Sequence, residues 1–146
     1  MEMMRFRRMN CSDDFNIGDY FMEKAQECEV SPSDSMGSPK QCFTNAMRMV
    51  LYSESEYDYV EGYNLYEGFP IEHAWVIDRA SGEHLDCTIE ETEGEYLGLI
   101  YPKRLIEMVL NEGFCEYRGS MYDTICSRRL SREKLLIIKS LLDTVN

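Results

Sequence analysis

The chain of 146 residues lacks any long apolar run, and no segment approaches the roughly 18 uninterrupted apolar residues of a membrane-spanning helix. Its first stretch, "MEMMRFRRMNCSDDF", contains three arginines but no apolar core of a secretory signal peptide. These two absences predict a cytoplasmic protein that does not insert into membranes. In that compartment the six cysteines are expected to be free thiols rather than disulfides.

Metal-binding patterns are also missing. The chain has two histidines and six cysteines, but it contains no Cys-x-x-Cys or His-x-x-x-His spacing. Cys115 and Cys126 stand too far apart to form a local zinc knuckle. We therefore expect no structural metal and no cofactor.

Basic residues are scarce, and one window has almost none. The chain has 15 Lys and Arg against 27 Asp and Glu, a formal net charge of −12. Between Glu54 and Glu95, thirteen acids face the single base Arg79, so this window contains the whole excess. Such a charge repels phosphate backbones and anionic membranes and favours a neutral or cationic protein or peptide partner. Alternatively, the acids only keep the protein soluble.

The N-terminal third predicts little regular structure before one clear helix. Residues 14–29 have the mixed polarity of short helical turns, and the Ser-, Pro- and Gly-containing stretch 30–40 predicts a loop. The following run, "QCFTNAMRMVLYSES", is rich in helix-forming residues. We expect Ser38 to cap this helix, Pro39 to occupy its first turn, and Cys42 to lie close to its N-terminus.

The rest of the chain predicts strands followed by helices. Alternating runs at 57–66, 70–78 and 83–89 predict three antiparallel strands, the last two joined by the turn "RASG". Two helices should follow, one with Pro102 at its start and Gly113 beyond its end, and one capped by Ser131. This order predicts an α+β fold in a single domain, 1–146, with a core at about 38–102 and a C-terminal helical part at 102–146.

The least common residues gather in one stretch, "PIEHAWVIDRASGEHLDCT". It contains the only tryptophan, Trp75, and both histidines, His73 and His84. Because side chains alternate along a strand, His73 and Trp75 share one face of the predicted sheet. His84 lies near the turn and is expected to be exposed and incidental.

The pairing of the two strands in this stretch decides which side chains meet. If Asp78 opposes Glu83 across the turn, Trp75 opposes Asp86, and His73 is a diagonal neighbour of Asp86. If the register shifts by two residues, His73 and Asp86 stand directly opposite each other. Both registers bring this imidazole and this carboxylate together.

These residues suggest a nucleophilic site. A carboxylate beside an imidazole fixes its tautomer and stabilises its charged form, which a general base requires. The N–H groups and the dipole at a helix N-terminus stabilise a thiolate at Cys42 and could bind an oxyanion. Alternatively, Cys42 is a small apolar core residue and His73 is a hydrogen-bonded structural histidine.

Four blocks in order, "QCFTNAMRMVL", "YVEGY", "IEHAWVID" and "GEHLDCT", resemble the transglutaminase-like branch of the papain-like cysteine enzymes. They are also similar to small uncharacterised phage and prophage proteins. The resemblance covers about residues 41–102 and implies a papain-like core, in which the nucleophile-bearing helix packs on a small antiparallel sheet. It implies Cys42 as the nucleophile, His73 as the base and Asp86 as the orienting acid.

The sequence departs from that family at two places. Asp86 is followed by Cys87, where the family usually has proline, and Gln41 adjoins Cys42 instead of preceding it by several residues. The Cys42 backbone N–H and the Gln41 side chain are therefore the candidate oxyanion donors. Trp75 is a candidate wall of the substrate cleft or a core residue.

We thus expect a cysteine-dependent acyl-transfer enzyme. The favoured reaction is hydrolysis of an amide bond, as in a peptidase, deamidase or amidase, and an amine acceptor would make it a transferase. The alternative is a non-enzymatic acidic inhibitor of phage type, which imitates nucleic acid and binds a basic protein in the host cytoplasm.

Overall fold

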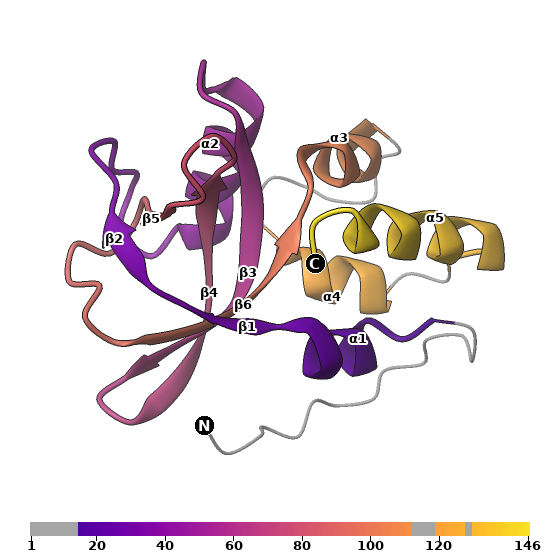
Figure 1. The fold of residues 1–146 in the computed structure, drawn as a ribbon, viewed down its shortest axis with the longest axis horizontal. Coiled ribbons are helices and arrows are strands. Elements are labelled where there is room, and N and C mark those ends of the chain that lie inside the picture. The colour runs from indigo at the N-terminus through magenta and orange to yellow at the C-terminus, as the bar shows by residue number, and fades with distance from the viewer. Residues whose placement is uncertain (1–14, 112–118, 128–129) are drawn as a thin grey trace.

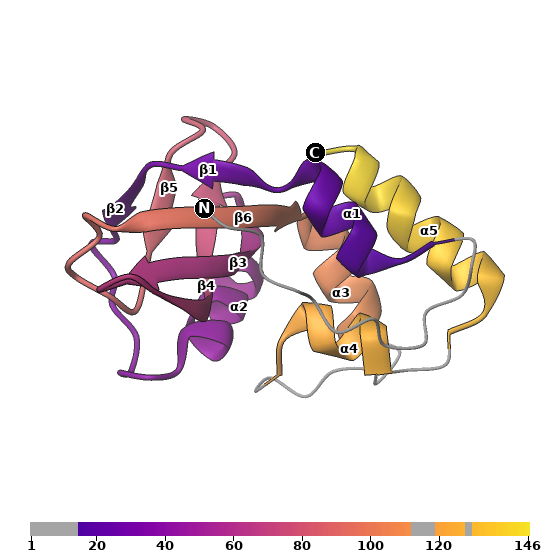
Figure 2. The same cartoon turned by 90° about the horizontal axis from the view of Figure 1, so that it is seen from below.

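The computed structural model describes residues 15–111, 119–127 and 130–146. A curled six-stranded sheet carries helix α2 (Cys42–Tyr52) on one face, and the other helices of the described chain gather beyond one end of the strands (Figure 1, Figure 2). These are α1 (Ile17–Lys24), α3 (Lys103–Asn111), α4 (Met121–Ser127) and α5 (Arg132–Asp143). The predicted α+β class is confirmed. Within the described ranges, no helix combines the length and apolar character needed to cross a bilayer.

The order of the strands explains the curl of the sheet. The strands are β1 (Gln26–Cys28), β2 (Val30–Pro32), β3 (Tyr57–Tyr66), β4 (Phe69–Asp78), β5 (His84–Asp86) and β6 (Glu95–Tyr101), arranged β1-β6-β3-β4-β5-β2. β1 and β2 are separated by Glu29 alone, yet they form opposite edges of the sheet. One continuous segment, 26–32, therefore bridges both edges, and the sheet must curl to let it do so (Figure 1).

The long β3–β4 hairpin is the centre of the sheet. Its antiparallel pairing runs from Tyr57 opposite Asp78 to Tyr66 opposite Phe69. Glu67 and Gly68 form the tight turn with φ angles of 48° and 84°. Two successive positive φ angles are typical of the type I′ turn, whose twist matches that of the adjoining strands.

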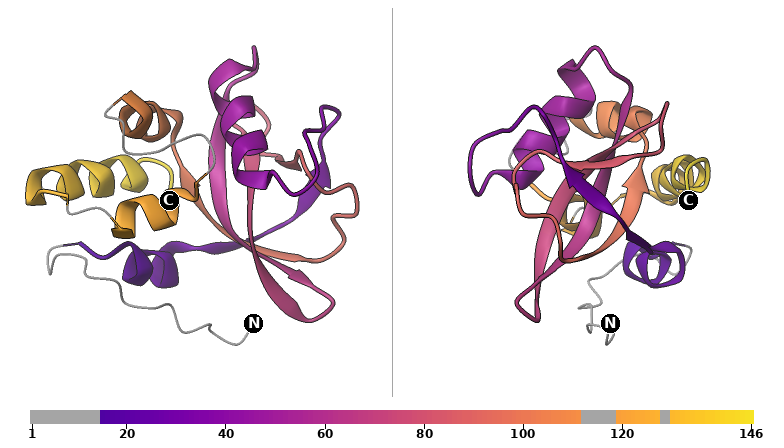
Figure 3. Two further views of the ribbon diagram at one scale, coloured as in Figure 1. Left: turned by 180° about the vertical axis from the view of Figure 1, so that it is seen from behind. Right: turned by 60° about the vertical axis from the view of Figure 1, so that its left-hand side comes forward.

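Each face of the sheet has its own apolar core. On one face, Ala46, Met47 and Val50 of α2 belong to a cluster that continues into Ala74 and Val76 of β4 and into the C-terminal helices. Seen from behind, α2 lies against this face of the hairpin (Figure 3).

The other face lies inside the curl. Its smaller cluster contains Val30, Val60, Trp75 and Tyr96, which all have at most 9% of their surface exposed. The face that bears Trp75 is thus closed by the same segment that bridges the sheet edges.

Two buried acids of β3 hold the helices at the end of the sheet. Oδ1 of Asp58 accepts a hydrogen bond from the backbone N–H of Lys103, at the start of α3. Glu61 accepts hydrogen bonds from the backbone N–H groups of Met121 and Tyr122, at the start of α4. In both cases a carboxylate satisfies N–H groups that a helix start leaves without an internal partner.

Most of the long elements agree with the sequence predictions. The three expected strands are present and antiparallel to their hairpin neighbours, and the register of β4 and β5, with Ile77 opposite His84, is the one in which Trp75 opposes Asp86. Pro102 directly precedes α3, and the Ser131 hydroxyl accepts a bond from the Lys134 N–H at the start of α5. Gly113 lies outside the described residues.

Other expectations were wrong. The predicted loop at 30–40 contains β2, because its backbone pairs in parallel with β5. Ser38 and Pro39 do not begin α2: Lys40 has a φ of 60°, and Gln41 is the N-cap, without a side-chain capping bond. The Ser38 carbonyl instead accepts a hydrogen bond from Asn45. Strands β1 and β6 and helix α4 had not been predicted.

Gly98 provides a test of the packing inside the curl. A Cβ atom at this position would lie 2.6 Å from Cζ2 and 2.7 Å from Cη2 of Trp75, and 2.7 Å from Cγ1 of Val60. We predict that Gly98→Ala lowers the free energy of unfolding by about 1–3 kcal/mol, because these buried groups would have to shift. Urea denaturation provides the measurement.

The double variant Gly98→Ala, Trp75→Phe is the control. Phenylalanine lacks the Cζ2 and Cη2 atoms of tryptophan. The losses of unfolding free energy in the single variants Gly98→Ala and Trp75→Phe should therefore sum to more than the loss in the double variant. Strict additivity would show that Trp75 does not limit position 98.

Candidate active site

Three elements bring the predicted site residues together. Cys42 is the first residue of α2 and is half-buried. His73 lies in the middle of β4 with 4% of its surface exposed, and Asp86 ends β5 and is fully buried. The thiol is therefore the most accessible group of the three.

His73 and Asp86 form a direct hydrogen bond. Nε2 of His73 donates to Oδ2 of Asp86 at 2.7 Å. The pair results from the strand register, since His73 is the diagonal neighbour of Asp86 on the same face. The imidazole also stacks on Trp75, with ring centroids 6.1 Å apart and an interplanar angle of 23°. The bond and the stacking together fix the ring orientation.

Asp86 has a full set of hydrogen-bond donors. The Tyr96 hydroxyl donates to Oδ2 at 2.9 Å, and the backbone N–H groups of Thr88 and Ile89 both donate to Oδ1 at 2.9 Å. Burial alone would raise the pKa of Asp86, but the hydrogen bond and charge of His73, with the two N–H groups, lower it. Asp86 is thus held as a carboxylate.

The second neighbour of His73 is Cys42, which lies within hydrogen-bonding reach. Burial would lower the pKa of His73, yet hydrogen bonds with Asp86 and Cys42 and the charges of both raise this pKa to about 9. The imidazole therefore carries a proton at neutral pH. His73 thus lies between a carboxylate and a thiol.

His84 was expected to be exposed and incidental, and this prediction was wrong. It is half-buried, and its Nδ1 accepts a hydrogen bond from Nε1 of Trp75 at 3.0 Å. Burial lowers the pKa of His84, and a protonated ring could not accept this bond. Neutral His84 thus holds Trp75, which in turn stacks on His73.

Trp75 and Gln41 were the two weaker candidates for the site. Trp75 is fully buried, so it is no wall of an open cleft and belongs to the core inside the curl. Gln41 is exposed and makes no side-chain capping bond to α2. The first-turn N–H groups beside Cys42 therefore receive no capping bond from Gln41.

Tyr96 is the residue that sequence reasoning missed. It lies on β6, and its ring contacts both His73, at 6.0 Å between centroids, and Trp75, at 5.1 Å. Its segment, "EYLGLIY", had not been predicted as a strand. If residues 95–101 had been interpreted as a strand, the alternation of side chains would have placed Tyr96 on one face of the sheet. It would not have predicted that the strand pairs with β1 and β3.

A groove runs along α2 on the side of the loop at 35–38. Ser35, Gly37, Arg48, Tyr52 and Cys87 are among the residues that line it. Asn45 ties its walls together, because Nδ2 donates to the Ser38 carbonyl and to the Thr88 hydroxyl, both at 2.8 Å. The groove gives solvent access to the side of α2 that lies next to Cys87, the residue after Asp86.

Cys28, Cys42, Cys87 and Cys126 are free thiols, and Cys11 and Cys115 lie outside the described residues. Among the residues described, no three His, Cys, Asp or Glu side chains form a group that could hold a metal ion. Comparisons of the chain with protein-family models, with curated proteins and with solved structures found no match.

The two histidines provide a test of the site. We predict that the His73 imidazole titrates near pH 9, well above its ordinary pKa of about 6.5, whereas His84 titrates below 6.5. NMR spectra of the imidazole protons measure both, and His84→Gln assigns the signals because the chain has only two histidines. Asp86→Asn should lower the pKa of His73, and an unchanged value would contradict the role of the pair.

The same shifts predict how stability changes with pH. The folded pKa of His73 lies above its unfolded value, so its stabilisation is full below pH 6.5 and is lost as pH rises through about 9. The folded pKa of His84 is depressed, so its contribution is full above pH 6.5 and is lost as pH falls. Urea denaturation from pH 5 to 10 should show the alkaline loss disappear in His73→Gln.

Proposed function

We propose that this protein is a cysteine-dependent acyl-transfer enzyme with a papain-like, transglutaminase-like core, and that it hydrolyses an amide bond. The observation that carries the proposal is the buried His73–Asp86 hydrogen bond, 2.7 Å long, with the half-buried Cys42 beside it at the start of α2. In this proposal Cys42 is the nucleophile, His73 the base and Asp86 the orienting acid.

The geometry supports a defined proton path. Because Nε2 of His73 is bonded to Asp86, Nδ1 is the ring nitrogen that exchanges a proton with the thiol of Cys42, and in the reacting form this proton is on Nδ1 and the sulfur is a thiolate. The thiolate sulfur attacks the amide carbonyl carbon, and the carbonyl electron pair moves to oxygen. When the carbonyl re-forms, the C–N bond breaks, the amine leaves with the proton from His73, and a thioester remains on Cys42.

Water completes the cycle. His73 takes a proton from water as the oxygen attacks the thioester carbonyl, the C–S bond breaks, and the acid product leaves while the proton returns to Cys42. An amine in place of water gives a transferase with the same residues. For the oxyanion we assign the first-turn backbone N–H of Cys42, which receives no capping bond from the Gln41 side chain.

A purely structural histidine explains the arrangement less well. A buried charged pair rarely stabilises a fold more than apolar residues of similar size would, since both groups lose their hydration. Here four donors serve one carboxylate, and the ring they fix lies beside a partly exposed thiol. Such an arrangement is expected of an imidazole that exchanges a proton with Cys42.

The runner-up proposal is an acidic inhibitor that binds a basic protein. Nine of the thirteen acids in the window 54–95 are exposed, which favours such a surface. Asp58, Glu61 and Asp86 are buried and hydrogen-bonded, however, so they cannot imitate phosphates. Salt-sensitive capture of nucleic-acid-binding proteins, unchanged in Cys42→Ala, would favour the inhibitor.

Thiol reactivity tests the enzyme. Brief exposure to iodoacetamide at pH 7, followed by intact-mass analysis, should show one fast-reacting thiol that is absent in Cys42→Ala. His73→Ala should slow the reaction at least about tenfold, since general bases contribute roughly 10²–10⁴-fold. Asp86→Asn should slow it less, because it disturbs only the orientation and charge of the ring.

Cys28→Ala is the matched control, because Cys28 is also half-buried, its thiol donates to the Gln26 carbonyl, and burial raises its pKa to about 11. This variant should keep the fast phase. If several cysteines react at the same rate, or if Cys42 ignores both His73→Ala and Asp86→Asn, the three residues do not form a working site.

A further inference from the structure

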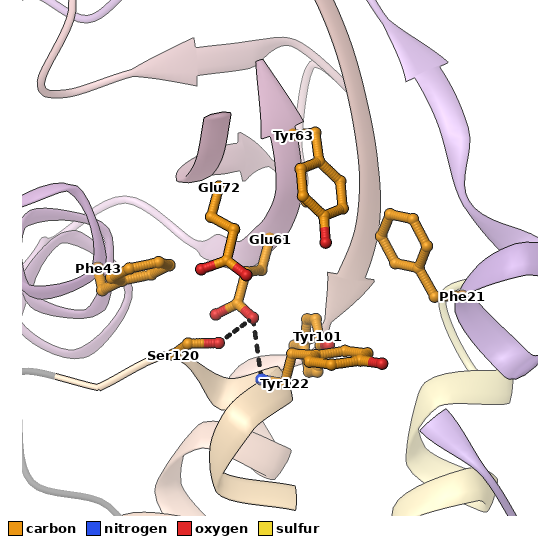
Figure 4. A pocket seen from close by; sticks show the side chains of 9 residues that line it. Phe21, Phe43, Glu61, Tyr63, Glu72, Tyr101, Ser120 and Tyr122 are labelled. Atoms are coloured by element: carbon orange, nitrogen blue, oxygen red, sulfur yellow. Dashed lines mark hydrogen bonds between the residues drawn. The ribbon is translucent and has the colours of Figure 1, made fainter. Parts of the chain in front are cut away.

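A small pocket lies where α1, α2, the β3–β4 hairpin and α4 meet (Figure 4). The alternation of side chains along the strands places it on the opposite face of the sheet from Asp86. Aromatic rings and two carboxylates line it, among them Phe43, Tyr63, Tyr122, Glu61 and Glu72. None of the described lining residues is basic. The pocket is therefore acidic and aromatic, and this is a surrounding that attracts a cation.

The two carboxylates have different tasks. Glu61 is buried and already accepts four hydrogen bonds, from Tyr59, Ser120, Met121 and Tyr122, so it holds α4 in place. Glu72 is exposed, and no described Lys or Arg forms an ion pair with it. Partial desolvation of its carboxyl group and the nearby charge of Asp123 raise the pKa of Glu72. A positive charge in the pocket would relieve this repulsion.

An independent observation comes from Tyr101, which also lines the pocket. Its hydroxyl is fully buried and has no hydrogen-bond partner in the described part of the chain. Buried polar groups almost always have a partner, so a donor is expected to reach this oxygen from the pocket. An ammonium group has three N–H donors and would satisfy it.

The size of the pocket narrows the ligand. The cavity has a volume of ≈ 20 Å³, and roughly 10–15 Å³ is enough for one water molecule. A compact ammonium group fits that volume, whereas the planar guanidinium of arginine is larger. The rings of Phe43 and Tyr63, which stand on either side of Glu72 in Figure 4, could contact an alkyl chain behind the ammonium group.

We propose that this pocket binds a primary ammonium group on an alkyl chain, such as a lysine side chain of a protein or peptide, between Glu72 and the Tyr101 hydroxyl. Phe43, the residue after Cys42, forms part of the pocket, so the bound cation would lie beside the first turn of α2. That the pocket selects lysine-containing substrates rests on the function proposed above; the binding of the cation does not.

The test uses n-pentylammonium and the neutral 1-pentanol, which have similar size but different charge. Both are titrated into Cys42→Ala at neutral pH, and the backbone amide signals of Phe43 and Tyr122 are followed by NMR. We expect saturable shifts with the ammonium ion only. Glu72→Gln should weaken its binding about tenfold, in line with a charge-assisted hydrogen bond, and Tyr101→Phe should weaken it less.

Glu83→Gln is the matched control, because it removes the same charge from an exposed carboxylate in the turn between β4 and β5 and should leave binding unchanged. Equal responses to ammonium and alcohol, no saturable response to either, or equal effects of Glu72→Gln and Glu83→Gln would overturn the cation site. The pocket would then hold water that satisfies Tyr101.

A second measurement separates this inference from the proposed function. In the native chain, pentylammonium should slow alkylation of Cys42 in proportion to its occupancy of the pocket, and Glu72→Gln should remove this protection. Binding without protection would overturn the role in substrate choice and leave the cation site standing. A failure of Cys42 to react rapidly would contradict the enzyme, while the binding data would remain valid.

Discussion

The buried carboxylate of Asp86 is the constraint on which the rest of the structure depends. A carboxylate without water must receive hydrogen bonds from the protein, because burying an unpaired charge is very costly. Its donors come from β4, from β6 and from the backbone after β5, so these parts must converge inside the curl. The position of Asp86 therefore determines where His73 points, and the start of α2 lies where that imidazole reaches the thiol of Cys42.

Glu61 shows how differently a second buried carboxylate behaves in the same sheet. It also accepts four hydrogen bonds, yet burial raises the pKa of Glu61, whereas the pKa of Asp86 is lowered. The difference lies in the partners, since Asp86 faces an imidazole that can carry a charge and Glu61 faces only neutral hydroxyl and N–H groups. Asp86 is therefore suited to stabilise a charged imidazole, and Glu61 is suited to hold the start of α4 by hydrogen bonds.

Local patterns predicted much of this, and long-range pairing did not. Alternation in "PIEHAWVID" and the short turn after it were sufficient to predict the meeting of His73 and Asp86, because the two lie only 13 residues apart. Tyr96 and β1 escaped prediction, since their neighbours are set by the closing of the sheet. The burial of Glu61 escaped too, because three of its four donors, Ser120, Met121 and Tyr122, lie about 60 residues away, at the start of α4. The local pattern of acidic residues does not show which carboxylate will receive hydrogen bonds from a distant part of the chain.

The bridging segment 26–32 also affects how the molecule behaves toward its own copies. An exposed strand edge is a template for pairing with another chain, and proteins often limit this risk with very short edge strands. Here both edges consist of strands of three residues that belong to one continuous segment. If that segment detached, β5 and the apolar β6, "EYLGLIY", would be uncovered at the same time. Seven consecutive residues therefore protect the whole sheet against edge-to-edge aggregation.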